Sequence, residues 1–125
     1  MMHTRFPFAD GGVPRLADLA GLGDRFHFWC GASGRRYLFS AVEARALADF
    51  RDALVVLARR DANGALIGEA VTLIGSTDAA ERGALTARLA ADPRLEAFVH
   101  LLAPTLHARQ AALDDLLGQT PRLAA

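Results

Sequence analysis

The residues of this 125-residue chain that are best suited to bind a ligand lie at the turn of a predicted hairpin. Two aromatic-rich segments, RFHFW and RRYLF, flank a short connection that contains glycine and is typical of a β-hairpin. Arg35 and Arg36 follow this turn directly. The backbone N–H groups of the turn, with Ser33 among them, and two guanidinium groups can bind a phosphate or a carboxylate.

The same residues also fit a plain turn that carries solvated arginines. A phosphate-binding loop usually leads into a helix, whereas this loop leads into a strand, so the sequence favours the plain turn. An indole beside paired guanidinium groups nevertheless suits an acidic partner. We therefore take Trp29, Ser33, Arg35 and Arg36 as candidate binding residues.

Arg59 and Arg60 complete the candidate binding set. They follow a predicted strand, and if that strand ends beside the hairpin turn, the two arginine pairs form one basic patch. Solvated strand ends are the alternative, because four arginines without interleaved exposed aromatic residues fall short of a nucleic-acid-binding surface.

The other reactive side chains do not form a catalytic set. His27 and Cys30 are three residues apart on one predicted strand, so their side chains point to opposite faces. His107 and Asp114 are two helical turns apart on one helix face, and they could lie with His100 at the rim of one site. No nucleophile and no metal-ligand spacing accompanies them. The sequence therefore predicts no catalytic residue, no metal site and no cofactor.

Composition limits the classes of function. Hydrophobic residues make up 52% of the chain, enough for the core of one domain. The formal net charge is zero, so no overall charge favours nucleic acid or an anionic membrane. The single Cys30 excludes an internal disulfide. We find no secretory leader and no apolar run that would span a bilayer, and we therefore expect a cytoplasmic protein that does not bind membranes.

The elements that must position the hairpin follow from the hydrophobic pattern. Residues 1–23 mix proline, glycine and aspartate and predict an irregular arm, and residues 24–125 predict a single domain. The apolar runs 53–58, 70–74 and 97–102 predict three strands beyond the hairpin. Helices are predicted over residues 41–51, 77–91 and 104–117.

The resulting order is ββαββαβα, which indicates an α+β domain with a mixed sheet of about five strands packed by two or three helices. Val56, Leu73 and Leu101 lie in the middle of three predicted strands. We expect each of these side chains to be buried.

From residue 53 onward, the order of elements resembles that of GIY-YIG nuclease domains. The segment 73–77, Leu-Ile-Gly-Ser-Thr, is similar to the Tyr-Ile-Gly-x-Thr segment of that family. The resemblance implies cleavage by two tyrosines, a helix arginine and a late metal-binding glutamate. Here Leu73 occupies the second tyrosine position, Gly83 occupies the arginine position with Arg82 one residue earlier, and the nearest late carboxylates are Asp114 and Asp115. The resemblance therefore implies a relative that lacks the catalytic set.

The stretch FWCGASGRRYLFS also resembles a segment of small alphaproteobacterial proteins, which implies a bacterial source but no activity. The sequence as a whole predicts a non-enzymatic binding or accessory module, which binds another protein through the aromatic, arginine-bearing hairpin. A divergent GIY-YIG-like nucleic-acid-processing domain is the first alternative, and a small-molecule sensor is the second. Convergence of Arg82, His107 and Asp114 on one cleft would favour chemistry, and dispersal would favour binding.

Overall fold

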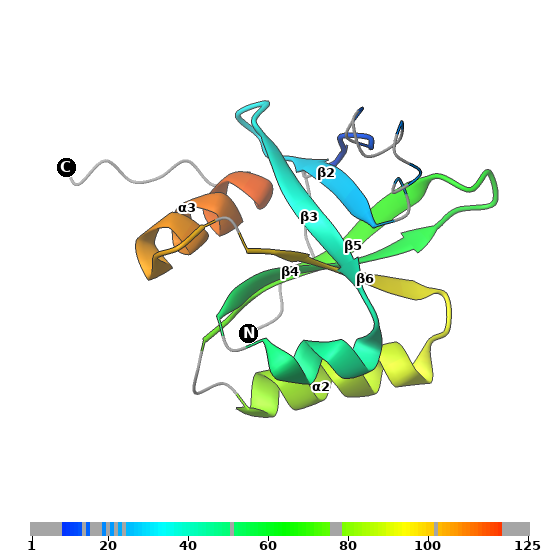
Figure 1. Cartoon of the computed structure of the whole chain (residues 1–125), viewed down its shortest axis with the longest axis vertical. Coiled ribbons are helices and arrows are strands. Elements are labelled where there is room, and N and C mark those ends of the chain that lie inside the picture. Colours follow the sequence, from blue (N-terminus) through cyan, green and yellow to red (C-terminus); the bar gives the residue numbers. More distant parts are fainter. Residues whose placement is uncertain are drawn as a thin grey trace.

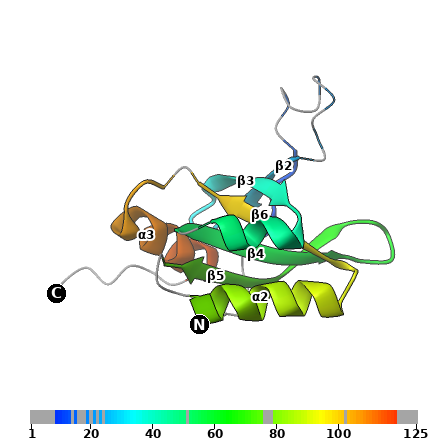
Figure 2. The same cartoon turned by 60° about the horizontal axis from the view of Figure 1, so that its bottom comes forward.

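The computed structural model describes residues 9–13, 15, 19, 21, 23, 25–50, 52–75, 79–101 and 103–118. They form a curled sheet with helices on both faces (Figures 1 and 2). In chain order the elements are β1 (Ala9–Asp10), β2 (Phe26–Cys30), β3 (Arg36–Val42), the 3-10 helix η1 (Ala44–Asp49), β4 (Ala53–Arg60), β5 (Leu66–Ile74), α2 (Ala79–Ala91), β6 (Leu95–His100) and α3 (Leu106–Leu116). The predicted α+β class is confirmed.

The sheet is antiparallel rather than mixed. Its strand order is β1-β2-β3-β6-β4-β5, and every pair of neighbouring strands in the described part of the chain is antiparallel. The connections through η1 and α2 do join parallel strands, but these strands are not neighbours. Strand β6 lies between β3 and β4, and β4 lies between β5 and β6. The expectation of a mixed sheet is therefore corrected, because the crossovers skip one strand position each.

The run ALVVLA belongs to β4, an interior strand of the sheet that is covered on both faces. Val55 and Leu57 face the cluster that contains Leu47 of η1 and Leu85 and Leu89 of α2. Leu54 and Val56 face the opposite cluster, to which α3 contributes Ala112, Leu113 and Leu116. A strand with apolar neighbours on both faces needs no alternation of polar residues. Figure 2 shows α2 and η1 together on one side of the sheet.

Three local expectations need correction. Strand β3 continues through Val42, so the helix predicted over residues 41–51 is shortened to η1. Strand β6 ends at His100, and Leu101 is 52% exposed instead of buried. Leu73 is only partly buried, because β5 is an edge strand with one neighbour, whereas Val56 is fully buried as expected.

The N-terminal arm contributes a short strand to the sheet. Ala9 pairs with Cys30 and Asp10 with Trp29, so the arm contains a regular element that its composition did not predict. Leu19 is exposed. The arm residues Phe6, Phe8, Leu16 and Leu22, residues 76–78, where the second predicted helix begins, and the tail after Gly118 lie outside the described residues. No helix among the described residues is long and apolar enough to cross a membrane.

We expect Leu54→Ala to lower the free energy of unfolding by about 2 to 5 kcal/mol, because the substitution leaves a cavity in a fully buried site. Leu101→Ala removes the same atoms from an exposed site and should cost less than about 1 kcal/mol. Chemical denaturation of the two variants measures both values. Equal destabilisation would contradict the position at which β6 leaves the sheet.

Candidate functional site

The predicted hairpin is formed by β2 and β3. Its register pairs Trp29 with Tyr37 and Cys30 with Arg36. The Gly31 N–H donates to the carbonyl of Arg35 (2.9 Å), and the Gly34 N–H donates to the carbonyl of Gly31 (3.0 Å). Gly34 has a φ of 87°, a conformation that glycine adopts without a steric penalty. The turn therefore places Ser33, Arg35 and Arg36 at one end of the sheet, where all three are exposed.

Trp29 does not reach this surface. Its side chain is 0% exposed and packs against Phe98, with the two ring centroids 5.8 Å apart. The strand alternation puts Trp29 on the inner face together with Tyr37 and Phe39, and the exposed arginines lie beyond it. Trp29 is therefore a core residue, and its assignment to the binding surface is corrected.

The carboxylate of Asp115, in the last turn of α3, holds the hairpin turn. It accepts hydrogen bonds from the Ser33 N–H (2.8 Å), the Ser33 hydroxyl (2.6 Å) and the Tyr37 hydroxyl (2.7 Å). The Asp115 carbonyl accepts a further bond from the Ala32 N–H (2.9 Å). A Cβ atom on Gly31 would lie 2.3 Å from an Asp115 carboxylate oxygen, so a side chain at that position would have to displace the carboxylate. We call this group of contacts the Asp115 clamp.

The Asp115 clamp shifts the pKa values of both of its titratable members. Burial, followed by the hydrogen bond to Asp115 and its negative charge, raises the pKa of Tyr37 to about 12. Burial also favours the neutral form of Asp115, but the hydrogen bonds from Ser33 and Tyr37 outweigh it and hold the pKa of that carboxyl below its ordinary value. Asp115 is therefore a carboxylate whose charge is stabilised by the turn.

A cleft of about 610 Å³ lies between the hairpin and α3. Small apolar residues of α3 and of the segment before it form one wall, and the hairpin forms the other. The lining residues are Phe28, Arg35, Arg36, Tyr37, Leu38, His100, Ala103, Pro104, Ala108, Ala111 and Ala112. None of these residues is acidic, whereas two are arginines. Figure 1 shows the C-terminal, red end of α3 beside the hairpin of β2 and β3.

Both arginines of the cleft rest on aromatic rings. The Arg35 guanidinium carbon lies 5.2 Å from the centroid of the Tyr37 ring, and that of Arg36 lies 4.5 Å from the centroid of Phe28. Neither arginine forms an ion pair with a described residue. Stacking limits the motion of a guanidinium group but leaves its N–H groups available for a carboxylate or a phosphate.

His100 lines the cleft and is 6% exposed. Its Nδ1 is 2.6 Å from the Leu38 carbonyl oxygen, which can only accept, so Nδ1 is assigned as the protonated nitrogen. The ring contacts Tyr37 edge-on, with centroids 5.8 Å apart, and Phe39 at 5.3 Å. His100 therefore fixes the backbone of β3 at the point where β3 enters the cleft.

Arg59 and Arg60 lie at the other end of the sheet. Strands β3 and β4 run in the same direction, and Arg36 begins β3 whereas Arg60 ends β4. The Arg60 guanidinium pairs with Glu96 (3.0 Å). The single basic patch is therefore not formed, and Arg59 and Arg60 are removed from the candidate site.

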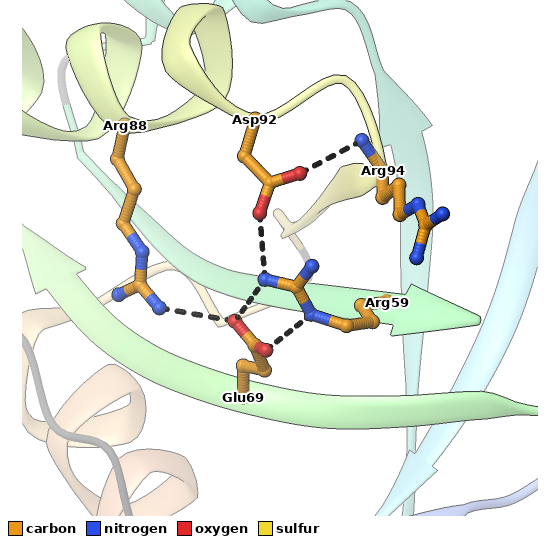
Figure 3. A network of polar contacts seen from close by, with 5 residues as sticks. All are labelled: Arg59, Glu69, Arg88, Asp92 and Arg94. Carbon is orange, nitrogen blue, oxygen red and sulfur yellow. Dashed lines mark hydrogen bonds and ion pairs between the residues drawn. The ribbon is translucent and has the colours of Figure 1, made fainter. Parts of the chain in front are cut away.

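Figure 3 shows that Arg59 instead belongs to an ion-pair network. It contacts Glu69 of β5 and, at 2.7 Å, Asp92 after α2, and Arg88 of α2 contacts Glu69 at 3.0 Å. Hydrogen bonds from Arg59 hold the pKa values of Glu69 and Asp92 below their ordinary values. These carboxylates thus stabilise the folded chain above their ordinary pKa, and the contribution is lost as the pH falls through the folded-state pKa. The network fastens α2 to the sheet.

The other candidate groups are dispersed. Arg82 lies on α2 and donates to the Gly75 carbonyl (3.0 Å), whereas Asp114 on α3 accepts from Gln110 (2.9 Å). Helices α2 and α3 cover opposite faces of the sheet. His107 is exposed on α3 and does not line the cleft with His100.

The predicted separation of His27 and Cys30 is also seen. His27 is buried and pairs with Asp10, whereas Cys30 is a partly buried free thiol on the other face of β2. Among the described residues, no group of three or more histidine, cysteine, aspartate or glutamate side chains could hold a metal ion.

Comparison with known proteins gives no relative. No family model, no curated protein and no solved structure matches this chain. The resemblance to GIY-YIG domains therefore stays a prediction, and the function has to be argued from the cleft itself.

Tyr37 is the only tyrosine of the chain, so its ionisation can be followed directly by absorbance. The folded protein should titrate at about 12 and the urea-unfolded chain near 10. The stabilisation from Tyr37 is fully present below the unfolded-state pKa and is lost as the pH rises through about 12.

We expect Asp115→Asn to lower the Tyr37 pKa while burial keeps it above the unfolded value. Asp114→Asn removes the neighbouring carboxylate, which contacts Gln110, and should leave the Tyr37 pKa unchanged. An identical titration of the two variants would contradict the Asp115 clamp.

Proposed function

We propose that this protein is a non-enzymatic binding module of the cytoplasm that recognises an acidic segment of another protein in the cleft between the hairpin and α3. The observation that carries the proposal is the composition of the cleft. Two exposed guanidinium groups stand over an apolar wall, and no acidic residue lines the cleft. An acidic segment complements this arrangement, because its carboxylates can form bidentate bonds to arginine.

The state of the arginines supports this assignment. Arg59 and Arg60 are engaged in ion pairs with Glu69, Asp92 and Glu96. Arg35 and Arg36 contact aromatic rings instead, and neither forms an ion pair with a described residue, although the charge of Arg35 also helps to stabilise the Asp115 carboxylate. Arginine and aromatic side chains are also the residue types that contribute most to protein interfaces.

The alternatives have less support. Arg82 and Asp114 lie on helices that cover opposite faces of the sheet, which favours binding over a shared catalytic cleft. A small-molecule sensor remains the second candidate, because a volume of about 610 Å³ lies in the range of ligand pockets. A free dicarboxylate added to the binding assay distinguishes this candidate, since it would then bind as tightly as an acidic peptide.

The test is binding of a fluorescent, glutamate-containing peptide to the wild-type protein and to the double variant Arg35→Ala/Arg36→Ala. Loss of two interface arginines should weaken binding by about 30-fold, which corresponds to about 2 kcal/mol. The melting temperature should change little, because both side chains are exposed.

The matched control is Arg45→Ala/Arg94→Ala, which makes the same change in net charge at exposed positions outside the cleft. This control should bind the peptide like the wild type. Equal weakening in both double variants would show a general charge effect, and undiminished binding in the first would refute the proposed site.

A further inference from the structure

Strand β3 has a free edge where it lines the cleft. Its pairing with β6 begins at Ser40, opposite Val99, and includes no residue before Ser40. Strand β6 ends at His100, and the chain then leads away from β3 towards α3 (Figure 1). The segment Arg36–Leu38 is therefore paired with β2 on one side and with no described strand on the other.

The hydrogen-bond pattern shows which groups face this free edge. The carbonyl of Arg35 and the N–H of Ala41 bond to the strand β2 side, through Gly31 and Arg25. Because antiparallel pairs alternate along a strand, Tyr37 and Phe39 also direct their backbone groups to β2. The backbone groups of Arg36 and Leu38 therefore point into the cleft, where the Leu38 carbonyl accepts from His100 Nδ1.

The residues that line the cleft are also those expected beside a free edge of β3. Tyr37 contributes from the inner face of β3, whereas Leu38 and Arg36 contribute from the outer face. Neighbouring residues of a strand point to opposite faces, so one cavity can be lined by both faces only where it opens onto the strand edge. A free edge of this kind pairs readily with an extended chain.

We infer that the acidic partner binds as an additional β-strand along Arg36–Leu38, between β3 and α3. This inference rests on the proposed function and adds the conformation and the charge pattern of the partner. Main-chain hydrogen bonds to Arg36 and Leu38 hold the segment, and the alanines of α3 leave room for its inward side chains.

The two arginines define the charge pattern of the segment. Arg35 lies over Tyr37, on the inner face of the hairpin, and Arg36 lies over Phe28, on the outer face. Consecutive residues of an extended segment also alternate between faces. Two adjacent acidic residues therefore reach one arginine each, whereas two acids separated by one residue compete for the same arginine.

The experiment uses three eight-residue peptides with blocked ends. The first has two adjacent glutamates flanked by valine and alanine, the second has the same sequence with alternate backbone nitrogens methylated, and the third has one alanine between the glutamates. N-methylation removes strand hydrogen bonds without changing charge. We expect at least about tenfold weaker binding of the methylated peptide and several-fold weaker binding of the spaced peptide.

Amide exchange by NMR gives a second readout on the wild-type protein. The Leu38 N–H should exchange at least about tenfold more slowly with the first peptide bound, whereas the Tyr37 N–H, which faces β2, should be unchanged. Equal binding of the methylated peptide with unchanged Leu38 exchange would overturn strand addition, and equal binding of the spaced peptide would overturn the assignment of one acid to each arginine. The proposed function itself would fail separately, if the first peptide bound equally to the wild type and to Arg35→Ala/Arg36→Ala.

Discussion

The carboxylate of Asp115 connects two parts of the chain that are far apart in sequence. Its bonds to Ser33 and Tyr37 join the hairpin turn to the last turn of α3 across 82 and 78 residues. A carboxylate that accepts three hydrogen bonds in a partly buried site keeps its charge and gives the contact a defined geometry. The cleft lies beside this contact, so its width depends on where Asp115 holds the turn.

The second constraint is the path of β6. Inserted between β3 and β4, it completes the central sheet, but it pairs with β3 only from Ser40 to Val42. The chain then turns towards α3, where the Thr105 hydroxyl caps the helix by accepting the Ala108 N–H (3.0 Å). The hairpin and α3 are held together at Asp115 but are separated where β6 leaves the sheet. They therefore enclose a cleft, and the edge of β3 is exposed in that cleft.

Local chemistry made much of the fold predictable. Glycines at Gly31 and Gly34 indicated the hairpin turn, and the uninterrupted apolar run 53–58 indicated a strand buried on both faces. Strand direction was not predictable, because it depends on which strand lies between two others. The alternation in β2 divided Trp29 from Phe28 without showing which side faces the core, and this is why Trp29 was misassigned.

The site was less predictable than the fold. Arg35 and Arg36 could be selected from their place after the turn, but the partners of Arg59 depend on the pairing of β4 with β5 and on the end of α2. The sequence contained one indication of the role of Asp115. A tyrosine beside a polar turn needs a hydrogen-bond partner for its hydroxyl group when that group is buried. Identifying that partner required the contact between α3 and the hairpin, which no local pattern encodes.

The most direct test of the Asp115 clamp is the exchange rate of the Ser33 amide proton, measured by NMR in the wild-type protein and in Asp115→Ala. In the wild type this N–H donates to the Asp115 carboxylate, and the Asn63 N–H, which donates to Asp61 in the other exposed turn, serves as the internal reference. The clamp predicts that Ser33 exchanges at least about tenfold faster in the variant while Asn63 is unchanged. Equal Ser33 exchange in the two proteins would contradict the clamp and the geometry of the cleft that depends on it.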